Sequence, residues 1–429
     1  MSSSDVTVNR NNNNKANGMS VRCLKDWYLP IFMDNFFEKR LLYDLFQAYY
    51  DARKNKRFAI NSLAFEIDYE KNILDLYQEI KERKYKIKPS ICFVIFKPVQ
   101  REIFAADFRD RIVHHLIYNY INQFCERIFI NDSYSCRVGK GTSYGIRRLN
   151  RFIRSCSRNY SRDCYVLKID IKGCFMAIDR FILYQKTKKI LYRFKDVADF
   201  DFNLVLWLIG KIIFNDPTEN CVIRGTKKNW QGLPKSKSLF YSGKNKGLPI
   251  GNLTSQLFGN LYLNDFDYFV KHRLGCNYYA RYVDDIAIVH SDKNYLKSII
   301  PVLKKYLQKE LFLELHPKKI YFQHFSKGVS FLGTIIKPHR IYIRNQVKGN
   351  FYRKIRYWNN FLKENQYNLT AKNIKEFLAS TNSYLGTMKH YNTYKLRKKI
   401  LTQDLSAQFW NYFYISGDYC KIIPITQKI

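Results

Sequence analysis

The stretch that decides the fold is Tyr278-Tyr-Ala-Arg-Tyr-Val-Asp-Asp-Ile-Ala-Ile-Val-His290. Aromatic and β-branched residues flank its two aspartates, a composition typical of two strands joined by a tight turn. The turn carries Asp284 and Asp285. Adjacent carboxylates repel one another, and apolar strands do not tolerate unpaired charge. A divalent metal is the usual reason to keep such a pair, whereas an isolated Asp-Asp turn would be an ordinary surface feature.

A second strand upstream, which also carries an acid, favours the interpretation of Asp284 and Asp285 as metal ligands. The run Tyr165-Val-Leu-Lys-Ile-Asp-Ile171 is rich in residues that form strands, and Asp170 stands near its end, just before a turn that contains Gly173. An acid at the end of one strand and two acids on a neighbouring hairpin can hold two Mg²⁺ ions ~3.5–4 Å apart, with Mn²⁺ as the expected substitute. Such a pair of ions activates a hydroxyl group and neutralises phosphate charge.

Together, Asp170 and the run Tyr282-Val-Asp-Asp285 resemble the palm of reverse transcriptases. The resemblance implies an α/β (α+β) right-hand polymerase fold, with fingers, a palm of antiparallel sheet plus helices, and a helical thumb. It also implies an RNA-directed DNA polymerase in which Asp170, Asp284 and Asp285 are the catalytic metal ligands. In that family the residue after the first aspartate, here Ile171, lends its backbone carbonyl to a metal.

The resemblance implies roles for further residues. Phe175 follows Asp170 by five positions, where the family has an aromatic sugar gate that excludes a 2′-hydroxyl; the alternative is a buried core phenylalanine. Lys319, preferred to Lys318, corresponds to a general acid toward pyrophosphate, unless both are solvated charges. The run Phe331-Leu332-Gly333 matches the primer-grip hairpin, and Tyr282 is expected to contact template or primer.

Charge and composition point to a nucleic-acid partner. The 429 residues carry a formal charge of +37, from 73 Lys and Arg against 36 Asp and Glu. A basic excess of this size implies a polyanion, because each phosphate that is neutralised releases counterions. No apolar stretch of about eighteen residues and no signal peptide is visible, so no membrane partner is expected. The scattered cysteines predict a reduced, cytoplasmic location without zinc or disulfides.

Patterning divides the chain into expected regions. Residues 1–20 are polar and predicted to be a disordered tail, and residues 21–90 carry helical periodicity. We expect fingers over 91–165, a palm over 166–336 with an inserted segment at 194–244, and a thumb with a C-terminal extension over 337–429. The apolar final stretch predicts packing on the body or a contact with a partner.

The expected fingers contain two basic features. Residues 91–96 predict a strand, and Lys97 and Arg101 lie on the hairpin that follows, where they can bind a triphosphate. Arg109 and Arg111 open a helix; either they contact template or nucleotide, or they are salt-bridged helix residues. His114 and His115 of this helix are interpreted as structural.

Two glycine-containing segments complete the pattern. The run Asp132 to Thr142 places Arg137 and Lys140 beside Gly139 and Gly141, and glycines allow close approach to phosphates; together with its neighbours it resembles a finger segment that contacts template. The run Gly247 to Leu263 predicts a glycine turn and a helix capped near Thr254 or Ser255. Gly251 and Gln256 are expected to contact the nucleotide.

The second segment departs from the pattern of many reverse transcriptases, and this departure narrows the resemblance to a part of the family. Many reverse transcriptases have Gln-Gly and Ser-Pro where this chain has Ile250-Gly251 and Ser255-Gln256. That resembles the bacterial reverse transcriptases of diversity-generating retroelements and of phage defence. The resemblance implies a cognate non-coding RNA template, dNTPs as substrates, a cDNA product and an accessory protein or oligomer. We expect a defence role, with mutagenic retrohoming as the alternative. A non-catalytic RNA-binding module is the rival from another class.

Overall fold

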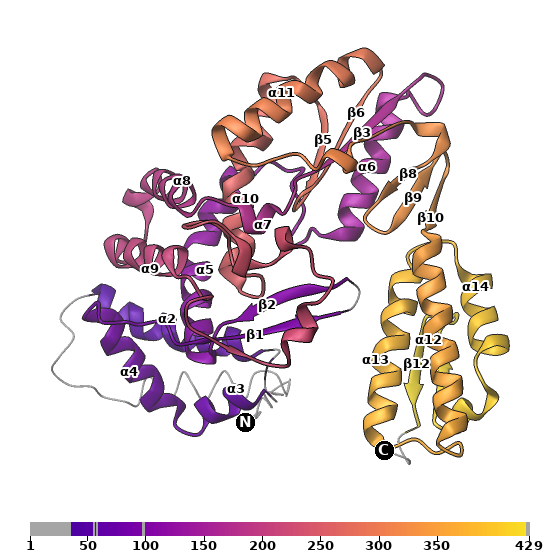
Figure 1. The fold of residues 1–429 in the computed structure, drawn as a ribbon, viewed down its shortest axis with the longest axis horizontal. Coiled ribbons are helices and arrows are strands. Elements are labelled where there is room, and N and C mark those ends of the chain that lie inside the picture. The colour runs from indigo at the N-terminus through magenta and orange to yellow at the C-terminus, as the bar shows by residue number, and fades with distance from the viewer. Residues whose placement is uncertain (1–35, 55, 57–58, 97–98, 426–429) are drawn as a thin grey trace, which may run out of the picture. The chain divides into compact units, whose positions relative to one another are not determined.

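The computed structural model describes residues 36–54, 56, 59–96 and 99–425, which form two compact units. The first unit contains residues up to 129, residues 172–265 and residues 308–313, and the second contains residues 130–171, 266–307 and 314–429. Both units mix helices and strands, so the predicted α/β class is confirmed (Figure 1). The predicted tail at residues 1–20 and the predicted nucleotide contact Lys97 lie outside the described residues. No helix among the described residues is long and apolar enough to span a bilayer.

The first unit is largely helical. Its helices and strands are α2 (Phe36–Arg53), α3 (Ile60–Glu66), α4 (Tyr69–Lys81), β1 (Ser90–Ile95), β2 (Arg101–Ala105), α5 (Phe108–Ile128), α7 (Cys174–Ala177), α8 (Arg180–Tyr192), α9 (Phe202–Phe214), β4 (Cys221–Ile223) and α10 (Leu253–Tyr268), with short helical turns η1 (Lys195–Val197), η2 (Lys227–Trp230), η3 (Lys235–Lys237) and η4 (Leu239–Tyr241). Helix α5 begins where the side chain of Asp107 accepts a hydrogen bond from the backbone N–H of Arg109, which caps the helix.

The inserted segment at 194–244 is built into a small sheet. Strand β1 pairs antiparallel with β2 and parallel with β4, which this segment supplies. The buried carboxylate of Glu102 on β2 accepts hydrogen bonds from Trp230 Nε1 at 2.6 Å and Ser238 Oγ at 2.7 Å. The segment therefore fixes the β1–β2 hairpin from the side. This contact pairs residues more than a hundred positions apart, and sequence periodicity could not predict it.

The second unit contains a four-stranded antiparallel sheet and a C-terminal helical region. Its helices and strands are α6 (Thr142–Cys156), β3 (Tyr165–Asp170), β5 (Tyr278–Tyr282), β6 (Asp285–His290), α11 (Lys293–Leu311), β7 (Tyr321–His324), β8 (Val329–Phe331), β9 (Thr334–Lys337), β10 (Arg340–Ile343), α12 (Asn345–Glu364), α13 (Ala371–Met388), α14 (Tyr394–Lys399), β11 (Phe413–Ser416) and β12 (Lys421–Pro424), with short turns η5 (Phe269–Arg273), η6 (Pro317–Lys319), η7 (Phe325–Lys327), η8 (Ile400–Asp404) and η9 (Ala407–Asn411).

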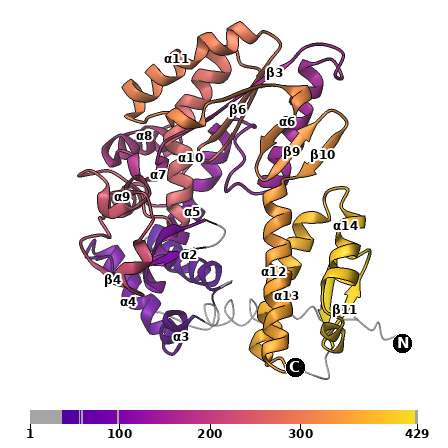
Figure 2. The same ribbon diagram turned by 45° about the vertical axis from the view of Figure 1, so that its right-hand side comes forward.

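The four-stranded sheet has the order β5-β6-β3-β7. Val166, Lys168 and Asp170 alternate along β3 with apolar residues, so the three side chains share one face. Helix α6 packs against β5 and β6 (Figures 1 and 2). Its apolar side supplies Ile146, Leu149, Phe152 and Ile153 to a core that also contains Val166 and Ala287. One end of this sheet face is therefore covered, and the acids lie toward the other end.

The C-terminal region of the second unit has its own core. Trp358 of α12, Phe377 of α13, Phe409 of η9, and Phe413 and Ile422 of the β11–β12 hairpin are all buried in one cluster. From Phe409 to Ile422, the apolar final stretch thus packs on the helices of this region, and its contact with a partner stays a prediction. The hairpin is a correction to the purely helical prediction: alternating apolar residues form two strands that cover the helices.

Candidate active site

The two aspartates lie on a strained hairpin. Strand β5 ends at Tyr282 and β6 begins at Asp285, so Val283 and Asp284 form a two-residue turn. Val283 has a φ of 56°, whereas Asp284 does not have a positive φ. A positive φ at the first turn residue alone is the pattern of a type II′ turn, which suits the twist of paired strands. A β-branched residue in this region costs on the order of 1–3 kcal/mol, so the surrounding structure must hold the turn.

The strand register brings the third acid to this turn. Asp170 of β3 lies directly opposite Asp285 of β6, and residues paired in this way project from the same face of a sheet. Burial, and then the nearby charges of Asp170 and Asp285, raise the pKa of Asp284 to about 6. The predicted catalytic acids, Asp170, Asp284 and Asp285, are thus brought together, and their like charges add to the effect of burial on the pKa of Asp284.

Two lysines lie beside the acids. Lys319 Nζ is 2.7 Å from Asp170 Oδ2, and Lys168 Nζ is 3.7 Å from Asp285 Oδ1. The backbone places Lys319 there, because the N–H of His316, just before η6, donates to the carbonyl of Asp170 at 2.8 Å. The two ammonium groups act as counter-ions for the carboxylates. Lys319 therefore lies where a general acid is expected, although its role in proton transfer stays a prediction.

The donor set fits a hard divalent cation. Carboxylate and carbonyl oxygens are the ligands that Mg²⁺ and Mn²⁺ prefer, and Asp284 resists ionisation because it is buried and because Asp170 and Asp285 lie nearby. Within the described residues, no three His, Cys, Asp or Glu side chains are already grouped tightly enough for a metal. Ile171 follows Asp170, is buried, and pairs its backbone with Leu315. Cation binding would therefore require the lysines to yield their contacts with the carboxylates.

A buried ion pair supports the turn from within the sheet. Arg281 donates from Nε and Nη2 to the two carboxylate oxygens of Asp267 at 2.7 and 2.6 Å, and Tyr279 Oη donates to the same carboxylate at 2.6 Å. Arg281 Nη1 also donates to the carbonyl oxygen of Val283 at 3.2 Å. The guanidinium thus links a fixed carboxylate to the strained turn. Sequence reasoning missed this residue, although a lone charge in an apolar strand was a usable signal.

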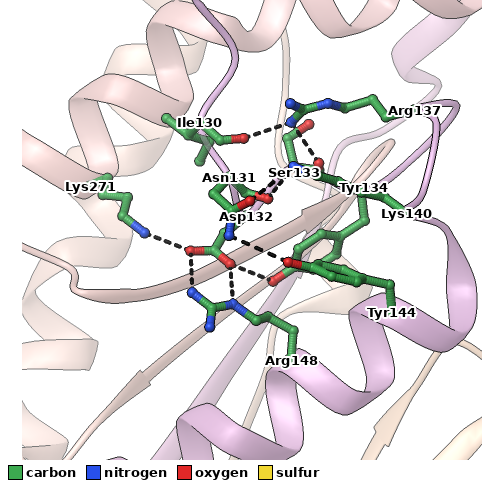
Figure 3. A network of polar contacts seen from close by, with 10 residues as sticks. All are labelled: Ile130, Asn131, Asp132, Ser133, Tyr134, Arg137, Lys140, Tyr144, Arg148 and Lys271. Carbon is green, nitrogen blue, oxygen red and sulfur yellow. Dashed lines mark hydrogen bonds and ion pairs between the residues drawn. The ribbon is translucent and has the colours of Figure 1, made fainter. Parts of the chain in front are cut away.

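The loop at 130–141 is held by its own polar contacts (Figure 3). The buried carboxylate of Asp132 accepts from Arg148 Nε at 2.7 Å and Lys271 Nζ at 2.7 Å. Burial opposes ionisation of Asp132, but these hydrogen bonds outweigh it and lower the pKa of the carboxyl. Gly139 and Gly141 have φ values of 72° and 115°, which favour glycine.

The two basic residues of this loop have structural contacts. Arg137 is buried and donates to the carbonyl oxygens of Ile130 at 2.7 Å and Ser133 at 2.9 Å. Lys140 Nζ donates to the carbonyl oxygen of Asn131 at 2.7 Å (Figure 3). In this structure both side chains therefore fix the conformation of the loop. The template contacts expected of Arg137 and Lys140 stay predictions.

The predicted primer-grip hairpin lies in the same unit as the acids. Leu332 and Gly333 have φ values of 44° and 85°, so they form the tight turn between β8 and β9. Phe331 is buried, and Lys168 Nζ lies 5.7 Å from its ring centroid. At the start of α6, Thr142 Oγ1 donates to Tyr282 Oη at 3.3 Å. Lys168 of β3 thus connects the primer-grip hairpin to the sheet that carries the acids, and Thr142 connects α6 to the end of β5.

In the first unit, Arg109 and Arg111 have different surroundings. Arg109 is buried, pairs with Glu79 and lies 5.2 Å from the ring centroid of Tyr85, which supports the salt-bridge alternative. Arg111 Nε donates to the carbonyl of Ala106 at 3.1 Å. Arg111 also lines a cavity of about 390 Å³ with Lys56, His115, Gly251 and Gln256, among others.

The glycine turn before α10 is tightly constrained. Gly251 has a φ of 131°, and a Cβ there would lie 2.9 Å from the carbonyl oxygen of Phe104. Helix α10 begins at Leu253, which corrects the predicted cap: Thr254 and Ser255 lie within the first turn. Thr254 Oγ1 instead meets the Nδ1 of His114 at 2.7 Å, and burial lowers the pKa of that histidine to about 3. His114 is thus neutral and structural, as predicted.

The remaining nucleotide-site predictions are on the surface or at the edge of the core. Arg101 is exposed at the start of β2, opposite Ile95. Phe175 is half-buried, and its ring would lie 3.3 Å from a Cβ at Gly259 on α10. The absence of a side chain at Gly259 therefore makes room for the ring. A partly exposed Phe175 is compatible with both the sugar-gate prediction and the core alternative.

Comparison with known proteins assigns the class. The family model for reverse transcriptase (RNA-dependent DNA polymerase) matches residues 100–336, more than half of the chain. The chain therefore belongs to the reverse transcriptase family, and this domain indicates an RNA-directed DNA polymerase. No curated protein matches the chain.

The comparison with solved structures found telomerases among the proteins similar to parts of this chain. Truncated apo telomerase from Candida tropicalis is 12% identical with a TM-score of 0.44, over 64% of this chain and 60% of that one. Telomerase from Candida albicans, solved with a fragment of telomeric RNA, is 11% identical with a TM-score of 0.38, over 78% of this chain and 63% of that one. The chain thus spans less than two thirds of each of these proteins.

Proposed function

We propose that this chain copies a cognate non-coding RNA into cDNA from dNTPs, using Asp170, Asp284 and Asp285 as its catalytic acids. The observation that carries the proposal is the strand register that sets Asp170 opposite Asp285, with Asp284 in the adjoining turn. The second observation is the lysine at 2.7 Å from Asp170. The right-hand arrangement of fingers, palm and thumb remains part of this proposal.

The acids are the residues that would hold Mg²⁺ or Mn²⁺, together with the carbonyl of Ile171. When bound, such ions lower the pKa of an attacking hydroxyl and neutralise phosphate charge. The sheet keeps Asp170 and Asp285 fixed in register, and the turn keeps Asp284 beside them, so little reorganisation of the acids is needed. Lys319 holds a proton next to Asp170, where it can be donated to the leaving pyrophosphate.

We further propose that the first unit binds the incoming nucleotide and the templating strand. Arg101 is exposed for a triphosphate contact, and guanidinium groups bind phosphates through two parallel hydrogen bonds. The cavity lined by Arg111, Gly251 and Gln256 also has Lys56 and Asp51 on its wall, so its two basic side chains outnumber the one acidic side chain. Gly251 allows a ligand to approach the backbone closely, because it adds no side chain to that wall.

For the biological setting we propose phage defence, with mutagenic retrohoming as the second candidate. The inserted segment at 194–244 and the apolar C-terminal stretch suggest added interactions, which favours defence. Both also pack within the chain itself, and the departures at Ile250 and Gln256 are shared by the two candidates, so the sequencing experiment below separates them. We also propose a reducing, cytoplasmic location from the scattered cysteines, and an accessory protein or oligomer as partner.

Primer extension on an RNA template tests the catalytic proposal. The Asp284→Ala/Asp285→Ala variant should lose extension while it still binds RNA. A matched control is Asp68→Ala/Asp75→Ala, which removes two exposed acids from the first unit. Extension by the Asp284→Ala/Asp285→Ala variant at the rate of the intact enzyme would refute the assignment.

Sequencing of co-purifying nucleic acid tests the setting. One defined RNA in both the intact and the variant protein, with complementary DNA only in the intact protein, would support a cognate template. Mutations scattered at template adenines would favour retrohoming, and short repeats or concatemers would favour defence. No enriched RNA would contradict the cognate-template proposal.

A further inference from the structure

Helix α6 presents a row of arginines that the catalytic proposal does not use. Arg147, Arg151 and Arg154 on the helix, and Arg158 just after it, are all exposed. Spacings of four and three residues place Arg147, Arg151 and Arg154 along one side of the helix, and Arg158 follows in the turn beyond its end. The opposite side is apolar and packs on the sheet face described above. We call these four residues the α6 arginine row.

The row is not neutralised by the protein. Among the residues that the structure describes, no carboxylate forms an ion pair with any member of the row, and Arg154 only donates to the amide oxygen of Asn159 at 3.3 Å. By contrast, the neighbouring Arg148 is paired with Asp132 at 2.7 Å. Unpaired like charges in a row repel one another, so the row costs stability unless something anionic binds it.

The use of arginine in place of lysine indicates which class of ligand the row binds. Every basic residue between Lys140 and Lys168 is arginine, although lysine is common elsewhere in the chain. Arginine has a planar fork of donors that fits phosphate oxygens in pairs, and it stays charged at any pH of interest. A solvated basic surface would have no such preference between the two residues. The composition therefore favours recognition of phosphate groups over a merely soluble face.

The end of the row is held in place. Ser157 Oγ donates to the carbonyl of Ile153 at 2.7 Å and accepts from the backbone N–H of Tyr160 at 2.9 Å. The ring of Tyr160 stacks on Phe325 with centroids 5.7 Å apart. Arg158 thus lies in a left-handed turn just beyond the helix, with a φ of 46°. Pre-organised contacts lose less entropy when a ligand binds.

The length of the row matches several phosphates. Arg154 lies seven positions after Arg147 on the helix, which gives about 10 Å at ~1.5 Å per residue, and Arg158 lies in the turn just beyond the helix. Phosphates of one strand are spaced at about 3.4 Å of axial rise in a duplex. The helix begins at Thr142, which contacts Tyr282 of the catalytic hairpin, and the row runs from there toward the far end of α6.

We propose that the α6 arginine row binds the sugar–phosphate backbone of RNA outside the catalytic acids, without reading its bases. The identity of the nucleic acid as RNA rests on the proposed function. An RNA held here extends along the side of the sheet, away from the hairpin that carries Asp284. The row would then retain the RNA while successive nucleotides pass the acids.

Salt-dependent RNA binding tests the proposal. The full-length protein is titrated with a fluorescent single-stranded RNA of mixed sequence, without nucleotides, over a series of salt concentrations. The variant is Arg147→Gln/Arg151→Gln/Arg154→Gln/Arg158→Gln. The slope of log affinity against log salt should become shallower by about 3, from four contacts at ~0.7 each, and low-salt affinity should fall at least about tenfold.

A matched control removes the same charge elsewhere. Lys293, Lys297, Lys304 and Lys305 are exposed on α11 of the same unit, and their replacement by glutamine also lowers the charge by four. This control should keep the intact slope, and a variant with lysine at all four row positions should keep most of it. Circular dichroism and thermal melting establish that each variant is folded.

Two outcomes would overturn the proposal. Either the glutamine variant of the row binds RNA with the intact affinity and slope, or the α11 control loses as much as the row variant. Because binding is measured without synthesis, these outcomes are independent of the extension assay on Asp284 and Asp285. A row that binds RNA in a protein without extension would leave this inference standing while the proposed function fails.

Discussion

Arg281 should be the residue whose loss costs the second unit most. Its guanidinium is fully buried, and so is the Asp267 carboxylate, to which it donates two hydrogen bonds at 2.6 and 2.7 Å. Arg281→Met keeps much of the aliphatic volume but leaves Asp267 with Tyr279 Oη as its remaining partner in the network. Breaking a buried pair by removing one partner costs about 3–5 kcal/mol. Against a typical total of about 5–15 kcal/mol, the loss should be visible in any unfolding assay.

A double variant distinguishes the loss of the ion pair from the cost of leaving the Asp267 carboxylate buried without its arginine. Asp267→Leu/Arg281→Met removes both charges, and apolar replacement of a whole buried pair is often neutral or stabilising. We expect the midpoint of urea unfolding, followed by tryptophan fluorescence, to drop for Arg281→Met and to recover in the double variant. An Arg281→Met midpoint equal to that of the intact protein would refute the reasoning. So would a double variant as unstable as the single one.

The same pair of variants distinguishes stability from positioning. Arg281 Nη1 donates to the carbonyl of Val283, in the turn that carries Asp284. Neither variant can make that bond, so both should extend a primer more slowly at saturating substrates, even where stability has recovered. RNA affinity should be unchanged, because the buried guanidinium does not reach the surface. Full extension by the double variant would show that the bond to Val283 has no role in placing the turn.

Three further predictions concern other parts of the chain. Burial raises the pKa of Asp110 to about 6, so the folded state binds the proton of this carboxyl more tightly than the unfolded state does. The free energy of unfolding should therefore fall by up to about 3 kcal/mol as the pH rises from about 4 to about 7. Asp110→Asn should remove this part of the pH dependence, as measured by urea unfolding at each pH. Gly251→Ala should destabilise the protein by about 1–3 kcal/mol, because the added Cβ would meet backbone atoms and φ is positive. Gly349→Ala is the control: it lies on a helix with open space around it and should stabilise the protein by up to about 1 kcal/mol. Lys319→Met should slow extension at saturating dNTP without weakening RNA binding, and an unchanged extension rate would remove Lys319 from the proposed proton transfer.

Local pattern was sufficient for the hairpin that carries Asp284 and Asp285 and for the class. The aromatic and β-branched run around Asp284 and Asp285 predicted the β5–β6 hairpin, because strand composition and turn position are properties of neighbouring residues. The acid at the end of β3 and its order relative to the hairpin indicated the family, which the family model confirms. The helical periodicity of residues 21–90 likewise predicted α2, α3 and α4. The arginine row on α6 was not predicted, because only packing shows which side of that helix is exposed.

Contacts between distant residues were decided by the tertiary structure alone. The pairing of Asp170 with Asp285 depends on a strand register that either sequence run, taken alone, leaves open. Arg109 was expected either at a nucleic acid or in a salt bridge, and burial pairs it with Glu79. Arg137, expected at the template, donates to backbone carbonyls in the folded chain. A basic residue has the same appearance in the sequence whether it faces solvent or the core. Its role follows from which groups it meets after folding, because a buried charge must find a partner and an exposed one need not.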